Sequence, residues 1–109
     1  MNTEQEPELT KGYQVQVDDN FHFMREDERW VLGNFATYEE ALTAAKQLVE
    51  NFFENADAQS SADELYEGFV AMGDDPFIVP FGGATLPKEN FSAWGHAKKY
   101  AERIAAARR

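Results

Sequence analysis

The segment that decides the fold reads YQVQVDDNFHFM (residues 13–24), REDE (residues 25–28) and RWVLGNF (residues 29–35). Apolar and polar residues alternate from Tyr13 to Asp18, which is the pattern of a strand with one buried face. The four polar residues 25–28 separate this first segment, which ends at Met24, from the second apolar segment at 29–35. Loops of that length commonly join antiparallel strands. The sequence therefore predicts an antiparallel β-hairpin in the N-terminal third of the chain.

The register of the predicted hairpin follows from its bulky residues. Pairing Met24 with Arg29 brings the two segments together as Phe23 with Trp30, Phe21 with Leu32, and Asp19 with Asn34. This register leaves Val31 and Phe35 on the outer face of the hairpin. It places Asp19 on the inner face, where an unpartnered carboxylate is costly. We interpret Asp19 as a structural acid that fixes a bend in the strand, with a functional acid as the alternative.

Two capping boxes predict where the first two helices begin. Thr37 with Glu40, and Ser61 with Glu64, each combine a hydroxyl before the helix with a glutamate at its third position. Apolar residues at helical spacing follow both boxes. Gly73 is expected to end the second helix in the left-handed conformation that glycine adopts readily.

The C-terminal third predicts one extended segment and one more helix. Residues 77–79 are apolar and lie between two prolines, which favours an edge strand or a buried extended segment over a central strand. A third helix is expected from about residue 91, with His96 beside its apolar stripe and facing solvent. The chain is thus predicted to be α+β, with a polar lead-in at residues 1–11. Residues 12–109 form a single domain in which three helices pack on the hairpin.

The composition restricts the class of protein. The chain has 109 residues, a net charge of −10, 43% hydrophobic residues and no cysteine. A chain of this length forms one domain, and without cysteine it has no disulfide framework and no thiolate metal site. No apolar run approaches the roughly 20 residues of a membrane span, and the acidic start is unlike a signal peptide. We therefore expect a cytoplasmic protein that needs no cofactor.

The charges are unevenly divided along the chain. Residues 1–75 hold 18 acids and four bases, whereas residues 76–109 hold two acids and six bases. The acidic part would repel a nucleic-acid backbone. Five of the bases belong to the last helix and its end: Lys98, Lys99, Arg103, Arg108 and Arg109. We interpret them as a solvated face, with a weak nucleic-acid contact as the alternative.

One segment brings together side chains that bind metals or small ligands. Asp18, Asn20 and His22 alternate onto the outer face of the predicted strand and could contribute ligands to such a site. A calcium loop is excluded, because its glycine position holds Phe23 and its bidentate acid position holds Arg29. The alternative is a polar outer face with a bend, and we predict no defined metal site.

The sequence contains no recognisable catalytic arrangement. Two histidines and no serine in a nucleophile elbow leave little material for a triad, and Gly82-Gly83 lacks the residues of a phosphate loop. We therefore predict a protein that is not an enzyme. Val31 and Phe35 beside Gln16 form an apolar strand surface that needs a cover, from helices of this chain or from another protein. The leading hypothesis is a protein-interaction module or homo-oligomer that uses these three residues.

Two resemblances accompany these predictions. LGNFATYEEA (residues 32–41) resembles the hairpin-to-helix corner of plant ethylene-response-factor DNA-binding domains and integrase arm domains, but here outward strand positions hold Gln14, Gln16 and Asp18 instead of arginines. Over nearly its whole length the chain resembles a family of small uncharacterised bacterial proteins. The motifs that carry this resemblance are VDDNFH (17–22), LGNF (32–35), EEA (39–41), DPFI (75–78) and FSAW (91–94). The second resemblance implies a single domain in a bacterial cytosol and names no catalytic residue.

Overall fold

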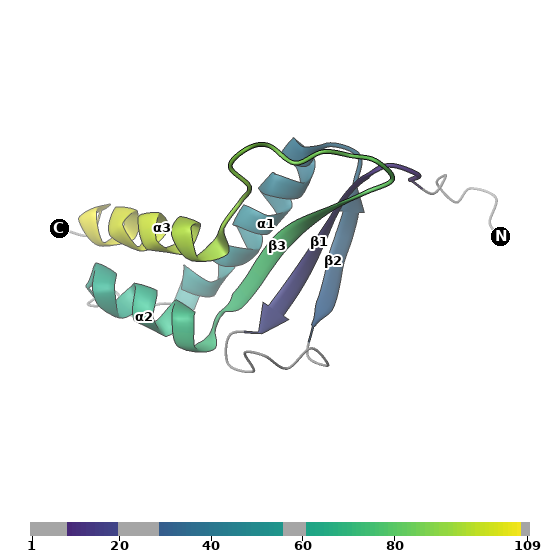
Figure 1. The fold of residues 1–109 in the computed structure, drawn as a ribbon. Coiled ribbons are helices and arrows are strands. Elements are labelled where there is room, and N and C mark those ends of the chain that lie inside the picture. Colours follow the sequence, from purple (N-terminus) through teal and green to yellow (C-terminus); the bar gives the residue numbers. More distant parts are fainter. Residues whose placement is uncertain (1–8, 20–28, 56–60, 108–109) are drawn as a thin grey trace.

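A computed structural model describes residues 9–19, 29–55 and 61–107 of the chain (Figure 1). It confirms the predicted α+β class, because a three-stranded antiparallel sheet packs with three α-helices. The strands are β1 (Gly12–Asp19), β2 (Trp30–Phe35) and β3 (Asp74–Phe81). The helices are α1 (Tyr38–Phe52), α2 (Ala62–Met72) and α3 (Ala93–Ala107), and α1 continues into the short 3₁₀ helix η3 (Phe53–Asn55).

The first strand is the centre of the sheet, whose order is β2-β1-β3. Its alternation has the predicted effect: Val15 and Val17 are buried, while Gln14 and Gln16 are only half-buried on the opposite face. We call the face with Val15 and Val17 the inner face and the opposite one the outer face. The position of β1 follows from burial, since a central strand is covered on both edges as well as on one face.

The predicted register of the hairpin is wrong. In the structure Trp30 pairs with Val17, and Asn34 pairs with Gln14 and not with Asp19, whose partner is Asp74 of β3. The predicted four-residue connection, residues 25–28, lies outside the described residues. Predicted partners 21, 23 and 24 lie outside the described residues. The prediction matched aromatic residues near the turn, whereas the observed register keeps Val15 and Val17 buried against α1 and contains a bulge between Val15 and Gln16 that shifts the pairing by one residue.

Both predicted capping boxes are present. The hydroxyl of Thr37 accepts a hydrogen bond from the Glu40 N–H at 3.1 Å, and Ser61 does the same for Glu64 at 3.1 Å. Gly73 ends α2 as predicted, but its φ of −81° is not left-handed. Glycine is needed there because a Cβ would lie 2.5 Å from Cδ1 of the Phe69 ring, which is fully buried.

The extended segment predicted at residues 77–79 is a longer strand at the edge of the sheet. Pro76 and Pro80 lie within β3, which spans Asp74–Phe81, and do not bound it. The edge position is as expected, since a proline has no N–H to donate to a neighbouring strand. The turn after β3 follows from Gly82, whose φ is +67°, a value that a residue with a Cβ rarely adopts.

Two clusters of buried side chains form the core. One lies between the inner face of the sheet and α1, and the other lies among the C-terminal end of α1, α2 and α3. Phe91 packs against both clusters and so connects them. His96 was expected to face solvent, but its side chain is only 14% exposed and its Nε2 lies 2.8 Å from Glu50 Oε2. None of the described helices is long and apolar enough to cross a membrane.

Candidate binding surface on the sheet

The helices all lie on one side of the sheet, as Figure 1 shows. Helix α1 packs against all three strands through the inner-face cluster, whereas α3 contacts β3 and packs mainly on α2 and α1. Among the described residues, no helix covers the outer face. A two-layer arrangement of this kind leaves one sheet face for solvent or for another molecule.

A row of amides crosses the outer face. Gln14 donates from Nε2 to Asn34 Oδ1 at 3.0 Å, and Gln16 donates from Nε2 to Gln14 Oε1 at 2.7 Å. The row connects β1 to β2 and fixes the orientation of each amide. Side chains held in this way lose little conformational freedom when a partner binds.

An apolar patch lies beside this amide row, at a β-bulge in β2. The register shifts between Val15 and Gln16, so that Gly33 pairs with the first, Val31 pairs with the second, and Leu32 is the extra residue. Val31 is 50% exposed and Leu32 is 36% exposed. Val31 and Gln16 therefore lie on the outer face, as the sequence predicted.

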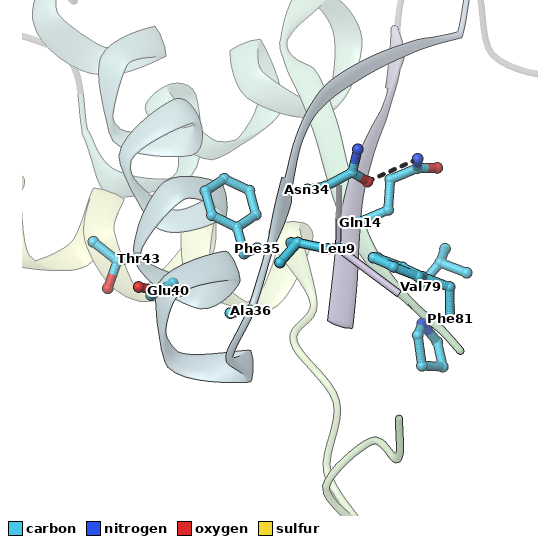
Figure 2. Close-up of a pocket in the computed structure, with 10 residues that line it drawn as sticks. Leu9, Gln14, Asn34, Phe35, Ala36, Glu40, Thr43, Val79 and Phe81 are labelled. Atoms are coloured by element: carbon cyan, nitrogen blue, oxygen red, sulfur yellow. Dashed lines mark hydrogen bonds between the residues drawn. The ribbon is translucent and has the colours of Figure 1, made fainter. Parts of the chain in front are cut away.

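The predicted outer position of Phe35 is wrong. Phe35 pairs with Tyr13 and packs against the inner-face cluster, and Figure 2 shows its ring on the α1 side of β2. The error follows from the register and the bulge, because an extra residue reverses which side chains of β2 point inward. Gly33 makes room for the ring, since a Cβ at residue 33 would lie 3.3 Å from Phe35 Cζ.

An open cavity of about 1120 Å³ lies where β2 leads into α1 (Figure 2). Its lining combines apolar side chains with one acid and polar groups, and includes Leu9, Asn34, Phe35, Glu40, Thr43 and Phe81. These residues come from the N-terminal segment, β2, α1 and β3. These residues were not predicted as a site, because no local sequence pattern links segments so far apart in the chain.

The proposed ligand row begins with Asp18, which is already paired. Its Oδ1 accepts a hydrogen bond from Arg29 Nε at 2.6 Å, and the Arg29 guanidinium lies 5.2 Å from the centre of the Phe77 ring. Asn20 and His22 lie outside the described residues. In the described part of the chain, no three acidic, histidine or cysteine side chains gather as a metal site would need.

A second carboxylate lies opposite Asp18 in the register. Asp75 of β3 pairs with Asp18 of β1 on the outer face. Partial burial of the Asp75 carboxyl, and then the charge of Asp18, raise the pKa of Asp75 from 3.8 to about 6. This end of the face therefore changes its charge in mildly acidic solution.

The edge of β3 that faces away from β1 is covered by the segment that follows the strand. Asn90 donates from Nδ2 to the carbonyl oxygen of Ile78 at 3.3 Å. Its Oδ1 accepts from the Tyr38 hydroxyl at 2.9 Å, and from the N–H of Phe91 at 2.7 Å. The segment after β3 is thus fixed beside that edge by side chains from α1 and from the segment itself.

The basic residues of α3 lie away from this surface. Lys98 and Lys99 are exposed, and the Arg103 guanidinium lies 5.7 Å from the centre of the Tyr100 ring. Arg108 and Arg109 lie outside the described residues. Helix α3 packs mainly on α2 and α1, at the end of the molecule away from β2 (Figure 1).

The surface around β2 thus combines an exposed apolar patch, an ordered amide row and an open cavity with a carboxylate. Comparisons with protein families, with curated proteins and with solved structures found no match.

Proposed function

We propose that this chain is a protein-binding module that works through the outer face of its sheet at β2. The exposure of Val31, at 50%, beside Leu32 at a face that no described helix covers, carries the proposal. Contiguous exposed apolar side chains with a border of polar residues mark protein-interaction sites. The setting we propose is a bacterial cytosol, as the resemblance to small bacterial proteins implies.

The surroundings of Val31 support this role. The amides of Gln14 and Gln16 lie next to the apolar patch and keep polar groups available at its border. An apolar centre with a polar border is the usual composition of a protein interface. No enzymatic activity is proposed, since Glu40, which lines the cavity, already accepts a hydrogen bond from the N–H of Thr37 as part of the helix cap.

The test compares Val31→Glu with Met72→Glu. Met72 is 58% exposed at the end of α2, so it offers the same change of apolar side chain to charge away from the sheet. We expect both variants to fold, with unfolding free energies within about 0.5 kcal/mol of wild type. Only Val31→Glu should abolish association, measured by light scattering for self-association and by affinity capture from a bacterial lysate. Association that survives Val31→Glu unchanged would contradict this site.

A further inference from the structure

Resting on that proposed function, we propose that β2 binds an extended, basic segment of a partner protein, which adds to the sheet as a fourth strand. Strand addition requires a free backbone edge on β2, and it favours β2 only if the opposite edge, on β3, is closed. A basic segment requires acidic groups near the edge that receives it.

The direction of the backbone groups in β2 follows from one hydrogen bond on the far side of the sheet. Because the carbonyl of Ile78 accepts from Asn90, it points away from β1. Its partner Val15 then points its own N–H and C=O away from β3 and toward β2. Val15 pairs with Gly33 of β2, so the N–H and C=O of Gly33 point toward β1. The backbone groups of successive strand residues point to opposite sides, and those of the next residue, Asn34, therefore point outward from the sheet.

The two edges of the sheet differ in their ability to receive a strand. Pro76 and Pro80 lie two residues on either side of Ile78, so their backbone groups also point away from β1. A proline nitrogen carries no hydrogen, so these two positions offer no N–H at the outer edge of β3. Asn90 occupies the carbonyl between them. In β2, from Trp30 to Phe35, there is no proline, and none of the described strands pairs with its outer side. An exposed edge of this kind binds extended peptides by main-chain hydrogen bonds.

The charge of the partner follows from the acids at this edge. Glu40 lines the cavity next to Asn34 and Phe35, and Glu39 precedes it in the first turn of α1. Since the chain carries a net charge of −10, lysine or arginine complements this region. A second copy would bring an equal negative charge to the same edge, which disfavours self-pairing there.

Peptides that bind the wild-type protein are selected from a display library of random peptides, each roughly ten residues long. The test variant is Asn34→Pro, which removes the outward N–H in the way that β3 does naturally. Asn34→Ala is its matched control, because it loses the side-chain contact with Gln14 and keeps the N–H. Glu40→Gln removes the charge and keeps the capping hydrogen bond of the helix.

We expect enriched peptides that alternate basic and β-branched residues. Their affinity should fall at least about tenfold for Asn34→Pro, stay within about threefold for Asn34→Ala, and fall about threefold for Glu40→Gln. Binding should also slow hydrogen exchange of the Asn34 amide. N-methylation of alternate peptide residues supplies a test that needs no protein variant. Methylation of the residues whose N–H groups face β2 should abolish binding. Methylation of the residues between them should leave binding intact.

The contrary outcomes separate this inference from the function on which it rests. Peptides that bind Asn34→Pro as well as wild type, or that tolerate both phases of methylation, would overturn strand addition. If Val31→Glu still abolished their binding, the outer face would remain a binding surface. Enrichment of acidic peptides would overturn the proposed charge. A wild-type dimer that Asn34→Pro separates would assign the edge to a second copy. No enriched peptide, together with no effect of Val31→Glu, would overturn both proposals.

Discussion

The two outer strands of the sheet pair with the same central strand, yet they meet their surroundings differently. Strand β3 has two prolines, a carbonyl occupied by Asn90 and a buried Ile78 at 3% exposure. Strand β2 has a bulge and an exposed patch at Val31 and Leu32. In the described part of the chain, one edge of the sheet is therefore closed and packed, whereas the other is open.

This difference separates stability from binding within one small sheet. Unprotected edge strands pair readily with other chains, and proteins commonly block them with proline or with a covering segment. Here the blocking devices are concentrated on β3. Substitutions in β3 should therefore change the unfolding free energy, while substitutions in β2 should change association.

The largest expected effect comes from truncating Ile78. Because Ile78 is buried between the sheet and α1, Ile78→Ala should lower the unfolding free energy by about 3 kcal/mol. Val31→Ala, the matched truncation on β2, should change it by less than about 0.5 kcal/mol. Urea unfolding followed by circular dichroism measures both. Equal losses for the two variants would remove the contrast between the strands.

A stabilising change is expected at Asp75. Its pKa is 3.8 in the unfolded chain and about 6 in the folded protein, so folding favours the protonated form and ionisation opposes folding. The penalty is absent below pH 3.8, grows up to about pH 6 and is complete above it. Asp75→Asn should therefore stabilise the protein by about 1–2 kcal/mol at pH 7, and the gain should disappear below about pH 4.

The control for this pH dependence is Glu67→Gln on α2, an exposed site for which we expect less than about 0.5 kcal/mol at either pH. Thermal unfolding of both variants across this pH range gives the comparison. A gain for Asp75→Asn that is the same at pH 4 and pH 7 would show that the carboxyl charge is not its cause.

The smallest expected loss concerns the cover of β3. Asn90→Ala removes hydrogen bonds to Ile78, Tyr38 and Phe91, and should cost about 1 kcal/mol of unfolding free energy. Glu89→Ala, one residue earlier, should have no measurable effect. Hydrogen exchange at the amides of β3 should become faster in Asn90→Ala only, and unchanged exchange would mean that Asn90 does not secure this edge.

Local signals predicted the helices well, whereas the pairing of the strands needed information from distant residues. Each capping box involves residues three apart, so Thr37 and Ser61 could be assigned from the sequence. The side on which Phe35 lies depends on the register and on a bulge, which no neighbouring residue encodes. Phe35 was therefore placed on the wrong face, while Val31 was placed correctly.

The candidate surface was likewise predictable only in part. The alternation in β1 located Gln16 on the outer face, but the cavity needs Leu9, Glu40 and Phe81, which belong to three separate segments. Prolines 76 and 80 were expected to bound a strand and instead lie within one. A proline indicates that a strand lies at the edge of a sheet, but its position does not show how far the strand continues beyond it.

The central position of β1 also determines when the sheet can be completed during synthesis. Strand β1 leaves the ribosome first, but Val15 obtains its partner Ile78 only after more than half of the chain has followed. Until then the nascent β1 presents an unpaired edge to the cell, next to the acidic first two-thirds of the protein. That early negative charge keeps neighbouring nascent chains apart while the last strand is still being made.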